Sequence, residues 1–448
     1  MEVLRHLLPE FVGLPPGKET GRKVKTAGRL VGLRDFGHLC FATLRDDGEE
    51  IQLILTRDTT GDAYGIWKAH VDPGDHVVVE GEVVTSRSGT LSVRVDAWSI
   101  AAKALRPLPE RTRGRRPRPR YEEMLADRAL LDRIRGRDAI LRHLRRHLHD
   151  DDFVEVETPL LQPVHGGTAR PFVTRLNAWG ADLYLGGTSE LYLKRLVVGG
   201  LERLFEISRA FRNEGVDAAH FPEFTLFEGY MAHADHMRMA RLVEDMLRGA
   251  ARETTGEDDA LREPFAREDM YDLLSREFGV RIGPESPREE LSRAADSRGV
   301  AHGPGDSPAR IAVLLLRKVV QPRLLRPTFV LGLPRDAAIL ARPSPGDERV
   351  AEAWKLIVMG TEVSQGCSEL TDPARQRERF VSQGVGTGRD KRIDHEFLRA
   401  LEYGLPPLAG FGIGVERLLT ALNPGTRLLD HQAHPISRPG GRRRTSRP

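Results

Sequence analysis

The stretch from Leu204 to Tyr230 reads LFEISRAFRNEGVDAAHFPEFTLFEGY, and the rest of the chain is organised around it. It contains two runs in which polar and apolar residues alternate, as they do along a β-strand that buries one face. A short segment that contains Gly215 and Asp217 joins the two runs. The pattern therefore predicts an antiparallel hairpin with one polar face.

The polar face of this hairpin carries a chemically mixed set of side chains. Along its two strands it presents Glu206, Ser208, Ala210, Arg212, Glu214, Phe224, Leu226, Glu228 and Tyr230. A planar guanidinium, carboxylates, an aromatic ring and a phenol suit a phosphate, a flat base and a cation bound side by side. The alternative is a solvated ladder of ion pairs, which Arg and Glu on a strand face usually form and which contributes little to stability.

Length and composition limit the class of protein. The chain has 448 residues, of which 40% are hydrophobic and 30% charged, so we expect a soluble globular protein of two or three domains. No stretch is long and apolar enough to span a bilayer, and the N-terminal MEVLRHLLPEF lacks the build of a signal peptide. Cys40 and Cys367 alone cannot make a disulfide framework or a zinc site, which favours a cytoplasmic location. With a net charge of only +3, any nucleic-acid surface must be local.

Residues 23–106 consist of short β-rich runs punctuated by turn residues. The expected strands are Val24–Gly32, Leu39–Arg45, Glu50–Leu55, His76–Val84 and Thr90–Ile100. Strands at this spacing, with a helical segment near Ala63–Ala69, predict a small OB-type barrel, a fold that binds single strands through aromatic and basic side chains. Residues 1–22 contain Pro15, Pro16 and Gly17 and are expected to be a flexible N-terminal extension.

A basic, proline-rich segment follows the predicted barrel. Residues 107–126 are expected to be a stiff linker rather than a folded element. This linker is either a solvated spacer or a segment that follows a phosphate backbone without sequence preference. A basic tail at 438–448 ends the chain and indicates no specific role.

Two further segments complete the pattern. An amphipathic run predicts a long helix from Asp127 to about His149, and the strand-like run Phe153–Pro159 follows it. Near the end of the chain, Gly410–Arg417 reads GFGIGVER and leads into a helical run. A dinucleotide-binding fold is disfavoured, because this spacing differs from GxGxxG and the strands before it form hairpins rather than βαβ units.

Together these segments resemble the signature motifs of class II aminoacyl-tRNA synthetases. The helix with Phe153–Pro159 is similar to the first motif. The sequence FRNE at 211–214, with Phe224 and Glu228, is similar to the second motif, and Gly410–Arg417 is similar to the third. The run ELYLKRLVVGGLERLFEISRAFRNEG at 190–215 resembles the lysyl-tRNA synthetases in particular. The resemblance implies an α+β fold in which the OB-type barrel at 23–106 precedes a catalytic domain at 127–437, an antiparallel sheet flanked by helices. It also implies a homodimer built on the first motif.

The resemblance implies that ATP activates the carboxylate of lysine and that the lysyl group then passes to tRNA. The implied ATP-binding residues are Arg212, Glu214, His220, Phe224, Glu362 and Arg417, with Arg212 and Arg417 catalytic. Arg212 would bridge the lysine carboxylate and the α-phosphate, because a guanidinium suits two anionic groups at once. Phe224 and Arg417 would sandwich the adenine, and Glu362 would hold Mg²⁺.

The resemblance also implies a lysine pocket and an RNA-reading face. The implied lysine-binding residues are Gly166, Glu190, Arg212, Glu228, Tyr230, Gln365 and Glu369. Several carboxylates around a dibasic substrate make electrostatic sense, because a buried cation without a partner is very costly. In the barrel, Arg34, Phe41 and Gln52 match positions that read the anticodon of tRNA in the resembled family.

Some positions depart from the resembled family. Lys355 replaces a glutamate that helps to hold Mg²⁺ in that family, and Thr90 replaces a glutamate that reads an anticodon base. Near the substrates, Gln365 replaces an asparagine, and Cys367 replaces an aromatic residue that walls the pocket. Phe221 replaces an asparagine, and Glu416 replaces an aspartate. Three hypotheses therefore stay open. The chain is a lysine–tRNA ligase, or a relative that passes lysine or an analogue to a protein, carrier or lipid, or a non-catalytic RNA-binding protein.

Overall fold

The computed structural model describes residues 1–110, 118–165, 169–217, 220–254, 261–382 and 393–436. The chain divides into two compact units, Met1–Asp132 and Arg133–Pro448. Among the helices of the described ranges, none combines the length and the apolar character needed to cross a membrane.

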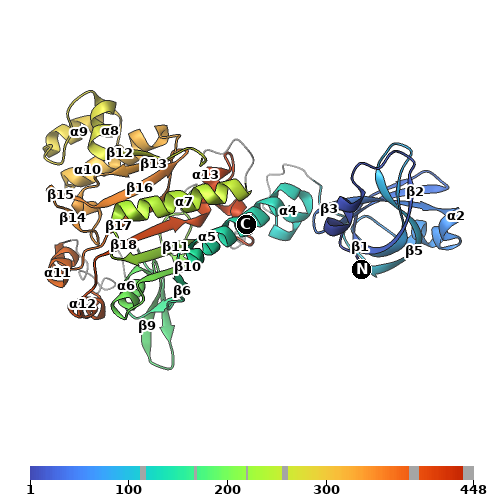
Figure 1. Cartoon of the computed structure of the whole chain (residues 1–448), viewed down its shortest axis with the longest axis horizontal. Helices are drawn as coiled ribbons and strands as arrows, with labels where there is room; N and C mark the ends of the chain where they lie inside the picture. The colour runs from blue at the N-terminus through green and yellow to red at the C-terminus, as the bar shows by residue number, and fades with distance from the viewer. Residues whose placement is uncertain (111–117, 166–168, 218–219, 255–260, 383–392, 437–448) are drawn as a thin grey trace, which may run out of the picture. The chain divides into compact units, whose positions relative to one another are not determined.

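The first unit is a closed five-stranded barrel with the strand order β1-β2-β3-β5-β4 (Figure 1). Its strands are β1 (Glu19–Asp35), β2 (Leu39–Asp46), β3 (Glu49–Thr56), β4 (His76–Thr85) and β5 (Leu91–Ala102). The short helices α2 (Arg57–Thr60) and α3 (Ala63–His70) lie between β3 and β4 in the chain. Alternate strand residues such as Leu53, Val79 and Val93 fill the barrel, so the predicted OB-type fold is confirmed.

The N-terminal residues are not the flexible extension that the prolines suggested. They form helix α1 (Leu4–Leu7) and the 3₁₀ helix η1 (Leu8–Phe11), and Leu4 and Leu7 are buried in the barrel core. Two leucines three positions apart on one helical turn give this segment an apolar face, which the barrel buries. The end of the predicted linker is also folded, since α4 spans Arg120–Ala126. Residues 111–117 of that linker and the tail at 437–448 lie outside the described residues.

The second unit is built on an eight-stranded sheet with the order β12-β13-β16-β17-β18-β11-β10-β6. Its strands are β6 (Val154–Glu155), β10 (Arg203–Phe211), β11 (Glu223–Ala232), β12 (Ala266–Asp269), β13 (Thr328–Leu331), β16 (Ala353–Val358), β17 (Thr361–Ser368) and β18 (Leu408–Gly414). The strands from β13 to β10 pair antiparallel, as expected. The two edge pairs, β10 with β6 and β12 with β13, are parallel, so the sheet is mixed.

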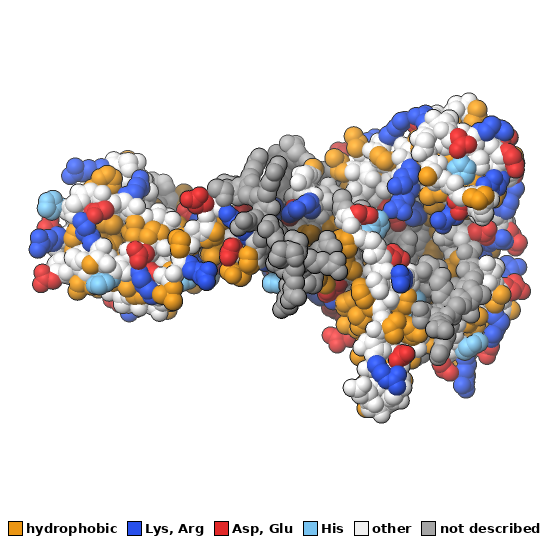
Figure 2. Space-filling view, turned by 180° about the vertical axis from the view of Figure 1, so that it is seen from behind, with side chains coloured by type: hydrophobic (Ala, Val, Ile, Leu, Met, Phe, Trp, Pro, Cys, Tyr) orange, Lys and Arg blue, Asp and Glu red, His pale blue; other side chains and the backbone are white. Residues whose placement is uncertain are grey.

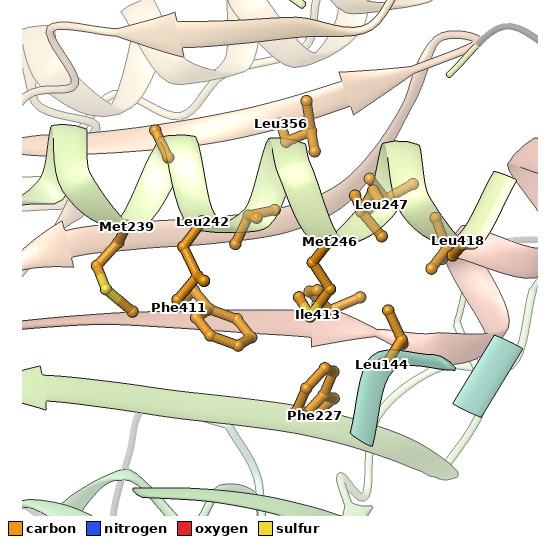
Figure 3. Packing of buried hydrophobic residues seen from close by; sticks show 14 of the residues in the cluster. Leu144, Phe227, Met239, Leu242, Met246, Leu247, Leu356, Phe411, Ile413 and Leu418 are labelled. Atoms are coloured by element: carbon orange, nitrogen blue, oxygen red, sulfur yellow. The ribbon is translucent and has the colours of Figure 1, made fainter. Parts of the chain in front are cut away.

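Helices cover one face of this sheet and leave the other for chemistry. The covering helices are α5 (Arg128–Asp150), α7 (His236–Thr254) and α13 (Val415–Leu422). Leu144 of α5 and Met246 of α7 pack against Phe227, Phe411 and Ile413 of the central strands (Figure 3). Alternation then places the neighbours of these core residues on the opposite face.

The remaining elements surround the sheet. A small sheet of β7 (Leu161–Gln162), β9 (Ala181–Leu185) and β8 (Val173–Leu176) precedes α6 (Glu190–Val198). A second cluster packs α6 with α11 (Pro373–Ser382) and α12 (His395–Glu402). A third contains α8 (Met270–Phe278), α9 (Arg288–Ser297), α10 (Pro308–Leu315), the π-helix η2 (Leu316–Val320), η3 (Gln321–Arg323) and the hairpin of β14 (Pro343–Ser344) and β15 (Asp347–Ala351). The 3₁₀ helices η4 (Arg335–Ala337) and η5 (Leu428–His431) complete the fold.

The predicted hairpin is present. Strands β10 and β11 pair antiparallel in a register that sets Glu206 opposite Glu228 and Leu204 opposite Tyr230. Phe205 and Phe227 point into the core, so the carboxylates of Glu206 and Glu228 belong to the opposite, polar face. The expectation drawn from residue alternation is therefore confirmed.

Candidate active site

A row of polar residues crosses the uncovered face of the sheet. Backbone register sets Lys355 of β16 opposite Gln365 of β17, Gln365 opposite Gly412 of β18, and Gly412 opposite Glu228 of β11. The next row along the strands contains Leu356, Ile413 and Phe227, which belong to the core beneath α7. The polar row therefore lies on the side of the sheet that the long helices do not cover.

Strand β18 forms a floor without side chains in the middle of this face. In GFGIG the glycines 410, 412 and 414 alternate with Phe411 and Ile413, which point into the core. A Cβ added to Gly412 would come no closer than 3.9 Å to any neighbour, so open space lies above it. Gly410 is different, because a Cβ there would lie 2.3 Å from the ring of Tyr230. The floor allows a ligand to lie against backbone between β11 and β17.

Glu228 is a buried carboxylate beside Gly412 of this floor. Its two oxygens accept hydrogen bonds of 2.8 Å from the Thr188 hydroxyl and from the Ser189 backbone N–H. Burial raises the pKa of Glu228 to about 7, and the charge of Glu190 adds to the rise, while Ser189 and Thr188 oppose it. A buried carboxylate with so high a pKa is suited to gain a cationic partner.

Tyr230, Glu190 and Glu369 gather next to Glu228, as the resemblance implied. Tyr230 is buried two positions along β11, and burial raises its pKa well above the usual range. Glu190 opens α6, and Glu369 lies buried just past the end of β17. Burial raises the pKa of Glu369 to about 7, although the Lys194 ammonium lowers it. These groups form an acidic pocket on three different elements.

Sequence reasoning missed Lys194, a fully buried lysine of α6 in this pocket. Its Nζ lies 2.7 Å from Oε1 of Glu190 and 2.5 Å from Oε2 of Glu369. The spacing of Glu190 and Lys194, four residues apart on a helix, predicts an ion pair. The burial of that pair and its contact with Glu369 depend on strands that are distant in the chain.

Arg212 and Arg417 lie at the other end of the floor. Arg212 follows β10, and its guanidinium carbon lies 5.1 Å from the centre of the Phe224 ring. Its Nε is buried without a hydrogen-bond partner among the described residues. Burial lowers the pKa of Arg212, and the charge of Arg417 lowers it further, while Glu228 opposes this. Two guanidinium groups close enough to repel each other suit an anion such as a phosphate between them.

The other predicted nucleotide-binding residues lie near this end but are more exposed. Oε1 of Glu214 lies 3.4 Å from the backbone nitrogen of Arg170, which donates to it. His220 is paired with Asp217, with 2.9 Å between Nδ1 and Oδ1. Their roles in ATP binding stay predictions. Gly166, predicted to contact lysine, lies outside the described residues.

Glu362 does not have the surroundings of a protein-held metal site. A bulge between β16 and β17 brings its carboxylate beside Lys355, with 2.8 Å between Nζ and Oε2. Within the described residues, no group of three His, Cys, Asp or Glu side chains could hold a metal ion. An ammonium in contact with the carboxylate disfavours a divalent cation there. The role of Glu362 as a metal ligand stays a prediction, and the contact with Lys355 counts against it. Gln365, next to Lys355, is exposed on the same face.

The barrel brings together the three residues predicted to read RNA. Arg34 pairs with Phe41 across β1 and β2, and its guanidinium carbon lies 5.9 Å from the Phe41 ring centre. Gln52 of β3 accepts a hydrogen bond of 3.0 Å from Ser92 of β5. Basic and acidic side chains are interspersed on the barrel face shown in Figure 2, in keeping with a net charge of +3. An aromatic ring with a neighbouring guanidinium is the type of platform on which single-stranded bases stack.

Replacing Phe41 with alanine should weaken tRNA charging without affecting amino-acid activation. Loss of one stacking platform costs about 1–3 kcal/mol, so we expect the KM for tRNA to rise by roughly 10-fold or more. The measurement is tRNA aminoacylation beside ATP–pyrophosphate exchange for the same variant. An unchanged KM for tRNA would remove Phe41 from the RNA-binding face.

Comparisons with known proteins agree with this geometry. The family model for class II tRNA synthetases (D, K and N) matches residues 113–437, and that for the OB-fold nucleic acid binding domain matches residues 24–101. The chain belongs to the class II tRNA synthetases, whose members are ATP-dependent ligases. Within that class its relatives include lysine–tRNA ligases. It is 41% identical to the one from Kineococcus radiotolerans and 40% identical to the one from Mycolicibacterium gilvum, and each match covers 97% of this chain and 91% of the relative.

A second group of relatives contains a region like this chain within a longer protein. The chain is 37% identical to the lysylphosphatidylglycerol biosynthesis bifunctional protein LysX from Nocardia farcinica, over 94% of this chain but only 39% of that relative. Likeness to LysX alone therefore does not decide which acceptor receives the lysyl group.

Proposed function

We propose that this chain activates L-lysine with ATP and transfers the lysyl group to tRNA(Lys), as a lysine–tRNA ligase. The observation that carries the proposal is the division of the site into two ends. One end is an acidic pocket formed by the buried Glu228 and Glu369 and the half-buried Glu190, and the other presents the guanidinium groups of Arg212 and Arg417. Lysine carries two amino groups and a carboxylate, so it matches these ends in charge.

In the first step, the carboxylate of lysine attacks the α-phosphate of ATP, and pyrophosphate leaves with its bonding electrons. Two anionic groups must approach each other for this to happen, and a guanidinium placed between them lowers that repulsion. Arg212 suits this role because its Nε atom is buried and has no hydrogen-bond partner among the described residues. The adenine ring would stack near Phe224 with Arg417 on its other side.

In the second step, a ribose hydroxyl of the tRNA attacks the carbonyl carbon of the lysyl-adenylate, and AMP leaves. The described active-site face offers positioning and charge, which agrees with direct transfer between bound substrates. Mg²⁺ would then be held mainly by phosphate oxygens and water, since Lys355 is in contact with the carboxylate of Glu362. The enzyme would work in the cytoplasm as a homodimer.

Two assays test this proposal. Lysine-dependent ATP–pyrophosphate exchange reports the first step, and charging of total tRNA reports the second. We expect both to be positive with lysine. Absence of exchange with every amino acid would leave an RNA-binding protein without catalysis.

A relative that passes lysine to a lipid or another non-tRNA acceptor is the second candidate. It is supported by the likeness to LysX and by the altered pocket position Cys367, which lies near Glu369 and Lys194. Exchange without tRNA charging would favour this candidate. The platform of Arg34 and Phe41 on the barrel supports tRNA as the acceptor instead.

Replacing Lys355 with glutamate should change the dependence on Mg²⁺. The variant exchanges the ammonium beside Glu362 for a second carboxylate, which would create a pair of oxygen ligands. We expect several-fold faster exchange when Mg²⁺ is limiting, measured by titrating Mg²⁺ at constant ATP. Lys355→Met is the control, because it removes the charge without adding a ligand. Unchanged or lower turnover of Lys355→Glu would show that Glu362 takes no part in metal binding.

A further inference from the structure

Lys194 places a permanent cation inside the acidic pocket. The side chain is 1% exposed, and its ammonium contacts Glu190 on its own helix and Glu369 just past the end of β17. These contacts use Oε1 of Glu190 and Oε2 of Glu369, so the second oxygen of each carboxylate lies outside them. Each second oxygen can accept a hydrogen bond from an amino group of a ligand.

The surroundings of Lys194 hold it in place. Its Nζ lies 5.9 Å from the ring centre of Tyr230 and 6.0 Å from that of Phe397, and the neighbouring Leu191 and Leu193 are buried in the same cluster. Moving the ammonium out of this contact would leave two carboxylates beside each other in a buried pocket, which is strongly unfavourable. Lys194 is therefore a fixed part of the pocket and not a mobile competitor of the substrate.

Lys194 lowers the net negative charge of the acidic pocket. In their ionised forms, Glu190, Glu228 and Glu369 contribute three negative charges, and Lys194 contributes one positive charge. The pocket then carries two net negative charges, which match the two ammonium groups of lysine, while Arg212 at the other end of the site would meet its carboxylate. Without Lys194 the pocket would carry three net negative charges, and buried carboxylates of that density take up protons.

We propose that Lys194 is a positioning and specificity-determining residue of the lysine pocket, whose ammonium stabilises the charge of Glu369 and holds Glu190 and Glu369 at a fixed separation before the substrate arrives. A substrate with a second amino group then meets carboxylates that are already in position. This inference rests on the proposed function, because it concerns the recognition of lysine at the same site.

Lysine binding should depend on pH through Glu369. The titratable groups that face Glu369 are Lys194 and Glu190 of α6, Tyr230 of β11 and Cys367 of β17. Burial raises the pKa of Glu369 to about 7, and of these groups Lys194 is the charge that lowers it. Lysine binds to the ionised carboxylate. The affinity for lysine is therefore highest above this pKa and falls as the pH drops through it. Removing Lys194 should move that fall to higher pH.

Lysine binding to the full chain, measured by calorimetry in two buffers of different ionisation enthalpy, tests the proposal. The number of protons released on binding follows from the difference between the two enthalpies. At about pH 8 we expect almost no proton release from the native chain and release of up to about one proton from Lys194→Met, because one carboxylate is then protonated before lysine binds. The dissociation constant of the variant should fall towards the native value as the pH rises, by about tenfold per pH unit.

Controls separate this role from a structural one. Lys194→Arg keeps the cation and should release no additional proton. Leu193→Ala removes a buried neighbour and should lower thermal stability without altering proton release. If Lys194→Met binds lysine more weakly at every pH with native proton release, Lys194 is only structural and the proposal is wrong.

A second variant keeps the test open if Lys194→Met does not fold. Glu190 is partly exposed, and its charge raises the pKa of Glu369, so Glu190→Gln should move the loss of lysine affinity to lower pH. An unchanged or higher midpoint would overturn the proposal. Failure of the native chain to bind lysine or to support exchange would instead contradict the proposed function, so the two failures are distinguishable.

Discussion

Exchange of pyrophosphate into ATP should fall by about 10³-fold or more when Arg212 is replaced with alanine. This half-buried guanidinium is the cation that we place between the lysine carboxylate and the α-phosphate, and its Nε is buried without a hydrogen-bond partner among the described residues. Its loss would leave two anions to approach each other without a bridging charge. The measurement is lysine-dependent exchange at saturating ATP, with circular dichroism to verify folding.

Arg209→Ala is the matched control for this variant. Arg209 lies three residues earlier in the same segment and is paired with Glu223 at 2.8 Å, and it also donates to Thr225. Loss of this contact should alter stability while exchange stays within about threefold of the native rate. If Arg212→Ala keeps more than a tenth of the native exchange, Arg212 does not have the role given to it here.

Replacing Glu228 with glutamine should raise the KM for lysine by about 10²–10³-fold. The carboxylate of Glu228 is buried and held by Ser189 and Thr188, so it is preorganised to meet a cation. Removing one charge of a buried ion pair costs about 3–5 kcal/mol, which corresponds to this loss of affinity. Glutamine has nearly the same shape, so the effect measures charge rather than packing.

Glu206 provides the control within the same pair of strands. It lies directly opposite Glu228 in the β10–β11 register, but its carboxylate accepts hydrogen bonds from the backbone and hydroxyl of Thr158. Glu206→Gln should therefore lower thermal stability and leave the KM for lysine nearly unchanged. Equal effects of the two substitutions on that KM would indicate that Glu228 is a structural residue like Glu206.

The native enzyme should also show the pH dependence that these pKa values imply. Burial raises the pKa of Glu228 to about 7 and that of Glu369 to about 7. Protonation removes the charge that lysine needs, so the KM for lysine should rise as the pH falls through about 7 and be lowest above it. A KM that does not change between about pH 6 and pH 8 would show that neither carboxylate binds an amino group of lysine.

Local patterns in the chain determined the elements of this protein. Residue alternation in Leu204–Tyr230 was sufficient to predict the hairpin and its polar face, and the barrel strands were predicted to within a few residues because turn residues separate them. The acidic residues of the lysine pocket were assigned through resemblance to a family, since they are widely separated in the chain. The buried leucines of α1 were missed because their partners come from barrel strands later in the chain.

Tertiary structure alone decided which charges meet. Glu190 and Glu369 are 179 positions apart in sequence, yet both contact Lys194, which places a cation between two carboxylates of the acidic pocket. A bulge placed Glu362 beside Lys355, although regular alternation would set Glu362 on the opposite face from Gln365. Periodicity specifies the face of a strand on which a side chain lies. The electrostatic environment of that side chain depends on strand order, register and burial, which distant parts of the chain determine together.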